Sequence, residues 1–113
     1  MWIRVALDNS AIQGKKNVYR WISGNAEEFY FGEDVAAALE RDGFLTEMWE
    51  KLDAVFDWGD CDFFIPEKCI AFKEWLIIRL QQKTDPIIRP VYETMLDYAD
   101  KAITRGTGIE FDF

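Results

Sequence analysis

The spacing of hydrophobic residues constrains the fold of this chain more than any other feature, and it differs between the ends and the middle. Apolar and polar residues alternate near both ends, as in strands that bury one face, over residues 2–8, 17–23, 27–31 and 109–113. In the middle, apolar residues recur every three or four positions, which is typical of helices. We therefore expect an α+β domain in which a small antiparallel sheet, an N-terminal meander plus the C-terminal strand, packs against three to four helices.

Four helical segments are expected in the middle of the chain. They cover residues 33–42, 44–57, 66–83 and 90–104. Gly43 interrupts the first run because glycine disfavours helix interiors, and Pro66 suits the first position of the third helix. The third segment is apolar almost all the way round. We expect it to be the most buried helix, with Trp75 largely buried.

The segments between these elements are expected to be loops. Residues 9–16 form the first loop of the meander, and Ser23–Gly24–Asn25 forms a turn because Gly and Asn tolerate positive φ. Residues 62–66 are expected to form an extended link. No linker or repeat interrupts the sequence, so we expect residues 1–113 to be a single domain.

The charge balance excludes several classes of partner. The chain has 21 acidic residues, 13 basic residues and no histidine, which gives a net charge of −8. Such a chain lacks the basic surface that binds phosphates or anionic lipids. The longest apolar run, Val35 to Leu39, is far shorter than the ~20 residues of a membrane span, and Arg4 and Asp8 interrupt the N-terminal apolar stretch. We expect a cytoplasmic protein that binds neither nucleic acid nor a membrane.

No pattern for catalysis or metal binding is present in the sequence. Without histidine the chain lacks the commonest general base and zinc ligand, and Cys61 and Cys69 do not have zinc-site spacing. Both cysteines are expected to be free thiols. Asp57, Asp60 and Asp62 do not match a calcium-binding loop. We expect no enzymatic activity, no metal, no cofactor and no small-molecule substrate.

The acidic residues are concentrated in one third of the chain. Residues 27–62 contain twelve acids and two bases, and aromatic residues are interleaved with them. This pattern has two interpretations: a solvated face beside ordinary core aromatics, or a surface that captures a basic partner. Four acids lie on one arc of the helix predicted over residues 44–57: Glu47, Glu50, Asp53 and Asp57. Their mutual repulsion costs stability, which favours the second interpretation.

In an interaction surface of this kind, charged residues and buried apolar residues have different roles. Charges steer the encounter with the partner, and aromatic anchors slow its dissociation. Trp49 falls at the border between the apolar arc and the acids. The candidate partner-binding residues are Glu47, Trp49, Glu50, Asp53, Asp57, Trp58, Asp60, Asp62 and Tyr30.

The C-terminal part of the chain combines a helix over Tyr92–Ile103, a Gly106–Thr107–Gly108 turn and a strand over residues 109–113. This ending resembles that of small bacterial immunity proteins of polymorphic or contact-dependent growth inhibition toxin systems. The resemblance implies a cytoplasmic, non-enzymatic and acidic protein that neutralises one cognate toxin domain, commonly a nuclease. The candidate residues come from charge and aromatic patterning alone.

Three functions are therefore compared. The first, which we expect, is an immunity protein that binds and neutralises a cognate toxin with a basic surface. The second is another acidic protein-interaction module, such as an adaptor or a nucleic-acid-mimicking inhibitor. The third is an enzyme that uses carboxylates only. A toxin gene beside this one would favour the first.

Overall fold

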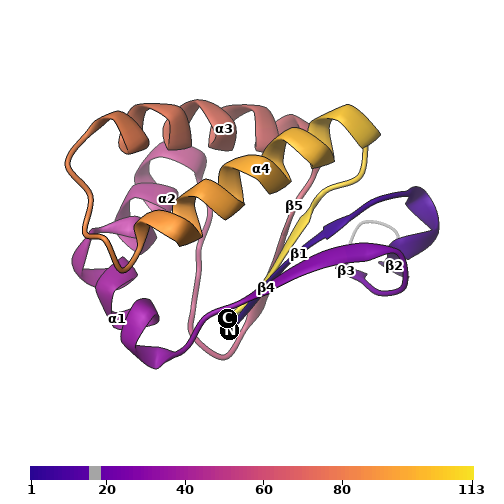
Figure 1. Cartoon of the computed structure of the whole chain (residues 1–113). Helices are drawn as coiled ribbons and strands as arrows, with labels where there is room; N and C mark the ends of the chain where they lie inside the picture. Colours follow the sequence, from indigo (N-terminus) through magenta and orange to yellow (C-terminus); the bar gives the residue numbers. More distant parts are fainter. Residues whose placement is uncertain (16–18) are drawn as a thin grey trace.

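A computed structural model describes residues 1–15 and 19–113 (Figure 1). Its strands are β1 (Trp2–Ala6), β2 (Ile12–Lys15), β3 (Tyr19–Ile22), β4 (Ala26–Tyr30), β5 (Cys61–Phe64) and β6 (Ile109–Asp112). A short 3₁₀ turn, η1 (Asn9–Ala11), precedes β2, and the helices are α1 (Glu33–Arg41), α2 (Phe44–Leu52), α3 (Pro66–Gln81) and α4 (Arg89–Arg105). The predicted α+β class, with an antiparallel sheet packed against helices, is confirmed.

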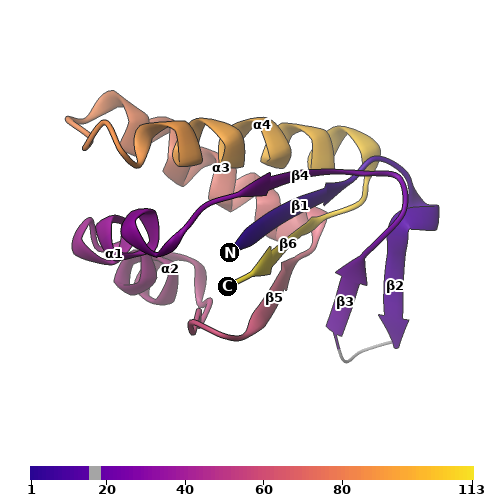
Figure 2. The same ribbon diagram turned by 60° about the horizontal axis from the view of Figure 1, so that its bottom comes forward.

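The main sheet has four antiparallel strands in the order β4-β1-β6-β5. The C-terminal strand β6 lies between β1 and β5, so the first and last strands are neighbours and the two chain ends lie side by side (Figures 1 and 2). Pairing of the C-terminal strand with the N-terminal strands is therefore confirmed.

Two strands lie where the sequence predicted loops. β2 falls within the predicted loop over residues 9–16, and β5 overlaps the predicted link over residues 62–66. The Cys-Asp-Phe-Phe sequence of β5 does not alternate cleanly, which hides the strand from a period-two analysis. This segment is a strand because it pairs with β6, which is distant in sequence, and the local pattern of residues does not reveal that pairing.

The predicted meander is also partly wrong. β1 pairs directly with β4, while β3 pairs with β2 in a separate two-stranded ribbon that projects from one end of the sheet (Figure 2). Residues 17 and 18 of the strand predicted over 17–23 lie outside the described residues. The ribbon is joined to the sheet by the buried carboxylate of Glu110, which accepts hydrogen bonds from Arg4 Nη1 (2.8 Å) and from the backbone N–H of Ile22 (2.9 Å).

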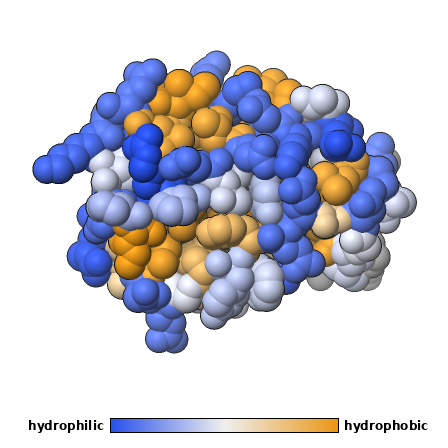
Figure 3. Space-filling model, viewed as in Figure 1, coloured by the Kyte–Doolittle hydropathy of each residue, from blue (hydrophilic) through white to orange (hydrophobic). Residues whose placement is uncertain are grey.

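Helices α3 and α4 cover one face of the sheet, and α1 and α2 lie beyond its end (Figures 1 and 2). The prediction that residues 66–83 form the most buried helix is wrong, because α4 packs on both β1 and α3 and is the more buried. α3 buries Cys69, Phe72 and Leu76 and leaves three isoleucines exposed: Ile70, Ile77 and Ile78. Figure 3 shows hydrophobic residues at the surface along the top of the molecule, where α3 lies. Trp75 is half-buried and packs against the core, with its ring 5.8 Å from that of Phe44 and 5.6 Å from that of Tyr92.

The second helix is shorter than predicted. α2 ends at Leu52 because Asp53 adopts a left-handed conformation (φ 53°), and residues 53–57 are not helical. Aspartate is among the few non-glycine residues that visit this region. Asp57 is therefore not on the helix, and the expectation that four acids share one helical arc is wrong.

The turn before β6 requires glycine. Gly108 has a φ of 148°, and a Cβ at this position would lie 2.7 Å from the carbonyl oxygen of Phe64 on β5. Thr107 is buried beside it and donates its hydroxyl to the backbone oxygen of Ala6 (2.7 Å). These contacts fix the register in which β6 enters the sheet.

Candidate protein-binding surface

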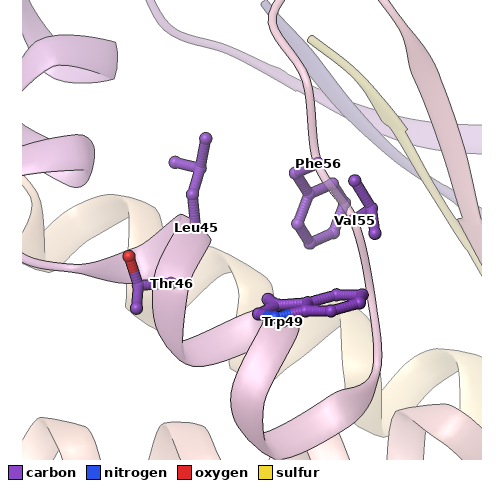
Figure 4. Close-up of a pocket in the computed structure, with 5 residues that line it drawn as sticks. All are labelled: Leu45, Thr46, Trp49, Val55 and Phe56. Carbon is purple, nitrogen blue, oxygen red and sulfur yellow. The ribbon is translucent and has the colours of Figure 1, made fainter.

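An open apolar groove lies between α2 and the extended segment that follows it (Figure 4). Its volume is about 440 Å³, and its lining residues are Leu45, Thr46, Trp49, Val55 and Phe56. Trp49 and Val55 are 56% and 57% exposed, whereas Phe56 belongs to the core. Large exposed apolar side chains beside a hollow are typical of a site that receives a partner.

The groove exists because the chain turns back after α2. The left-handed Asp53 ends the helix, and the N–H of Ala54 then donates to the carbonyl oxygen of Met48 (3.0 Å). In the extended chain that follows, Ala54 and Phe56 point inward while Val55 points outward. Val55 thus faces Trp49 across the groove, as Figure 4 shows.

Exposed carboxylates lie next to the groove-lining residues in the sequence. Glu50 follows Trp49 on α2, Asp53 ends the helix, and Asp57 follows the buried Phe56; all three acids are exposed. We call the residues Trp49, Glu50, Asp53, Val55 and Asp57 the groove surface. It combines two apolar side chains with three negative charges.

Glu47 does not join the groove surface. It is half-buried and lines a different groove of about 290 Å³ between α2 and α3, with Lys51, Trp75, Ile78, Arg79 and Gln82. Hydrogen bonding to Asp42 raises the pKa of Arg79, and the negative charge of Glu47 adds to this increase. The basic residues that line this second groove balance the charge of Glu47.

The role of Trp58 is largely structural. It is half-buried, its ring lies 5.3 Å from that of Phe113, and its Nε1 donates to Glu40 (3.4 Å). The backbone N–H of Phe113 donates to the carbonyl oxygen of Asp60 (3.0 Å), whose own side chain is exposed. The segment that carries these acids is thus attached to the C-terminal end of the sheet.

The structure brings three of the predicted aspartates into electrostatic contact. Asp62 on β5 is half-buried, and burial raises the pKa of its carboxyl, with further increases from the negative charges of Asp60 and Asp57. The positive charge of Lys68 acts in the opposite direction and lowers the pKa of Asp62.

Tyr30 lies apart from the groove. It is 58% exposed at the end of β4, where its ring lies 5.1 Å from that of Trp2 on the neighbouring strand. Sequence reasoning missed Trp2 because it was assigned to the polar face of a strand. It also missed Val55, because a helix over residues 44–57 would have placed this residue in the core.

The cysteines provide a direct test of this part of the structure. Cys61 on β5 is exposed and Cys69 on α3 is buried, yet burial raises the pKa of both thiols to about 12, and Glu110 and Asp112 contribute at Cys61. A raised pKa leaves little thiolate until the pH approaches that value. We expect iodoacetamide at about pH 8 to modify Cys61 roughly a hundredfold more slowly than free cysteine, and Cys69 only after unfolding.

This reactivity is measured by mass spectrometry over time, with the urea-unfolded protein as the control. Cys61→Ser is expected to leave stability unchanged, and Cys69→Ala to cost about 1–2 kcal/mol. Modification of Cys61 at the rate of free cysteine, or stoichiometric zinc in the purified protein, would contradict the expectation. Among the described residues no cluster of three or more Cys, Asp or Glu side chains could hold a metal ion.

Comparison with protein-family models, curated proteins and solved structures gives no match to this chain. In the part of the chain that the structure describes, no helix is both long and apolar enough to cross a membrane.

Proposed function

We propose that this protein is an immunity protein that binds and neutralises a cognate toxin domain with a basic surface in the cytoplasm. The observation that carries the proposal is the groove surface, where the exposed Trp49 and Val55 line the groove and the exposed carboxylates of Glu50, Asp53 and Asp57 follow or flank them in the sequence. Tryptophan is the residue type most enriched among the side chains that dominate binding energy.

A basic toxin domain suits this surface for a physical reason. A nuclease carries Lys and Arg side chains to bind the phosphates of its substrate. Carboxylates that engage those same side chains compete with nucleic acid, and an apolar anchor prolongs the complex once it has formed. Neutralisation of this kind requires that substrate be excluded, and it requires no catalytic group on the inhibitor.

Co-expression tests the proposal directly. A toxin domain encoded by a gene that flanks this one is induced in cells with and without this protein. We expect growth to be restored when the protein is present, and an equimolar complex to be recovered from the cells. A Glu93→Gln variant, altered on the exposed surface of α4, serves as a control that should protect fully.

Continued growth arrest together with the absence of a complex would contradict the proposal. A stable complex with a different basic protein, formed without any protection, would instead favour the adaptor function. The two readouts, growth and complex formation, therefore separate the two interaction functions.

A further inference from the structure

The open face of the sheet carries a second exposed patch. The ribbon of β2 and β3 covers one end of this face, where Ala6, Ala11 and Ile22 are buried together (Figure 2). At the other end, pairing places four residues in one row across the strands β4, β1, β6 and β5. In that order they are Tyr30, Trp2, Asp112 and Cys61, and each is exposed.

The charge on this end of the face is negative. Arg4 lies on the same face as Trp2, but Glu110 (2.8 Å), Asp112 (3.2 Å) and Glu28 (3.6 Å) already surround its guanidinium. One cation therefore meets three carboxylates, and the side chains of Glu28 and Asp112 remain about half exposed. We call Trp2, Glu28, Tyr30 and Asp112 the sheet-end patch.

Stabilisation of the sheet explains only part of why aromatic side chains and carboxylates lie together in the sheet-end patch. The aromatic pair across β1 and β4 supports the strand pairing, as cross-strand aromatic pairs do. The solvent face of an antiparallel sheet normally carries polar side chains, however, and here Tyr30 and Trp2 remain 58% and 36% exposed. Exposed aromatic side chains next to carboxylates have the same chemistry as the groove surface.

The sheet-end patch and the groove surface are connected by one short segment. Val55 lines the groove, and Cys61, six residues later, pairs with Asp112 in the patch. Six residues span at most about 22 Å. A stable interface uses ~20–30 residues from each partner, many more than line the groove. The two surfaces are therefore close enough for one partner domain to reach both.

We propose that the sheet-end patch is a second contact for the same basic partner, and that it receives an arginine or lysine side chain. The cation would lie against the exposed ring of Tyr30 and pair with the carboxylate of Asp112 or Glu28. This inference rests on the proposed function, because it assigns the patch to the toxin domain that the groove surface binds.

Affinity for the neutralised toxin domain tests the patch. We expect Tyr30→Ala and Asp112→Asn each to raise the dissociation constant by about tenfold. The matched control is Ile78→Ala on α3, because Ile78 is 59% exposed against 58% for Tyr30. It should change the constant by less than about twofold. Thermal unfolding of each variant confirms that the fold is retained.

The outcomes distinguish the two proposals. If the parent protein binds the toxin, Trp49→Ala weakens binding and Tyr30→Ala does not, the patch assignment is overturned and the proposed function stands. If the parent protein binds no toxin domain, the proposed function fails, and the assignment of the patch to that partner fails with it.

A second measurement uses a defined probe, a hexa-arginine peptide, and follows the indole N–H signals of the tryptophans by NMR. We expect saturable shifts of the Trp2 and Trp49 signals, and no shift for the half-buried Trp75. Asp112→Asn combined with Glu28→Gln should remove the shift of Trp2 and preserve that of Trp49. A Trp2 signal that the peptide leaves unmoved in the parent protein overturns the patch.

Discussion

Deletion of residues 109–113 is expected to leave the chain without a cooperative unfolding transition. The segment holds the strand β6, which lies between β1 and β5. Ile109 and Phe111 are fully buried, and Phe113 is 8% exposed. Loss of one large core side chain costs about 2–5 kcal/mol, so loss of three approaches the ~5–15 kcal/mol by which a typical domain is stable.

Polar contacts add to this expected effect. Without Glu110, the guanidinium of Arg4 loses a partner and the N–H of Ile22 loses its carboxylate acceptor. Circular dichroism and thermal unfolding of the truncated protein measure the outcome. Phe113→Ala is the milder control, and it should lower the melting temperature while the transition stays cooperative. A truncated protein that melts at the temperature of the parent would reject this arrangement of strands.

Trp49→Ala is expected to speed dissociation of the toxin complex by about thirtyfold or more, because truncation of an anchor costs ~2 kcal/mol or more. Trp49 is 56% exposed in the free protein, so the same change should alter folding stability by less than about 0.5 kcal/mol. Trp58→Ala is the contrasting variant. Trp58 packs on Phe113, and its removal should destabilise the fold.

Much of the fold could be predicted from the sequence because local signals and packing agree there. Alternation predicts β1, β4 and β6, and helix start and stop signals predict α1, α3 and α4 to within a few residues. The strand β5 and the ribbon strand β2 could not be predicted, because pairing with another segment decides both of them.

The candidate surface was predicted less completely, and one backbone conformation explains most of the difference. The left-handed Asp53 ends α2, and this turns Val55 from a predicted core residue into an exposed wall of the groove. Glu47 lies in the second groove with Arg79 for a different reason, because helix geometry places it nearly opposite Trp49 on α2. The placement of Tyr30 beside Trp2 depends on strand register, which the local sequence does not specify.

The acidic part of the groove surface can be tested without disturbing the backbone. The variant carries Glu50→Gln, Asp53→Asn and Asp57→Asn, and asparagine tolerates the left-handed conformation that Asp53 adopts. Glu47→Gln is the matched control, because this acid lies in the charge-balanced groove between α2 and α3. Neither variant should lose folding stability, because the three acids of the triple variant are exposed and glutamine has the same size as the half-buried Glu47 that it replaces.

Stopped-flow association with the toxin domain, recorded across salt concentrations, tests the central claim most directly. Exposed charges act mainly on the association rate, and their effect weakens with salt because the Debye length is ~8 Å at physiological ionic strength. We predict that the triple variant associates about tenfold more slowly than the parent at low salt, with a flatter salt dependence, while Glu47→Gln behaves like the parent. If the triple variant associates as fast as the parent at physiological salt and protects cells equally well, the acidic groove surface is a solvated face and does not bind the toxin.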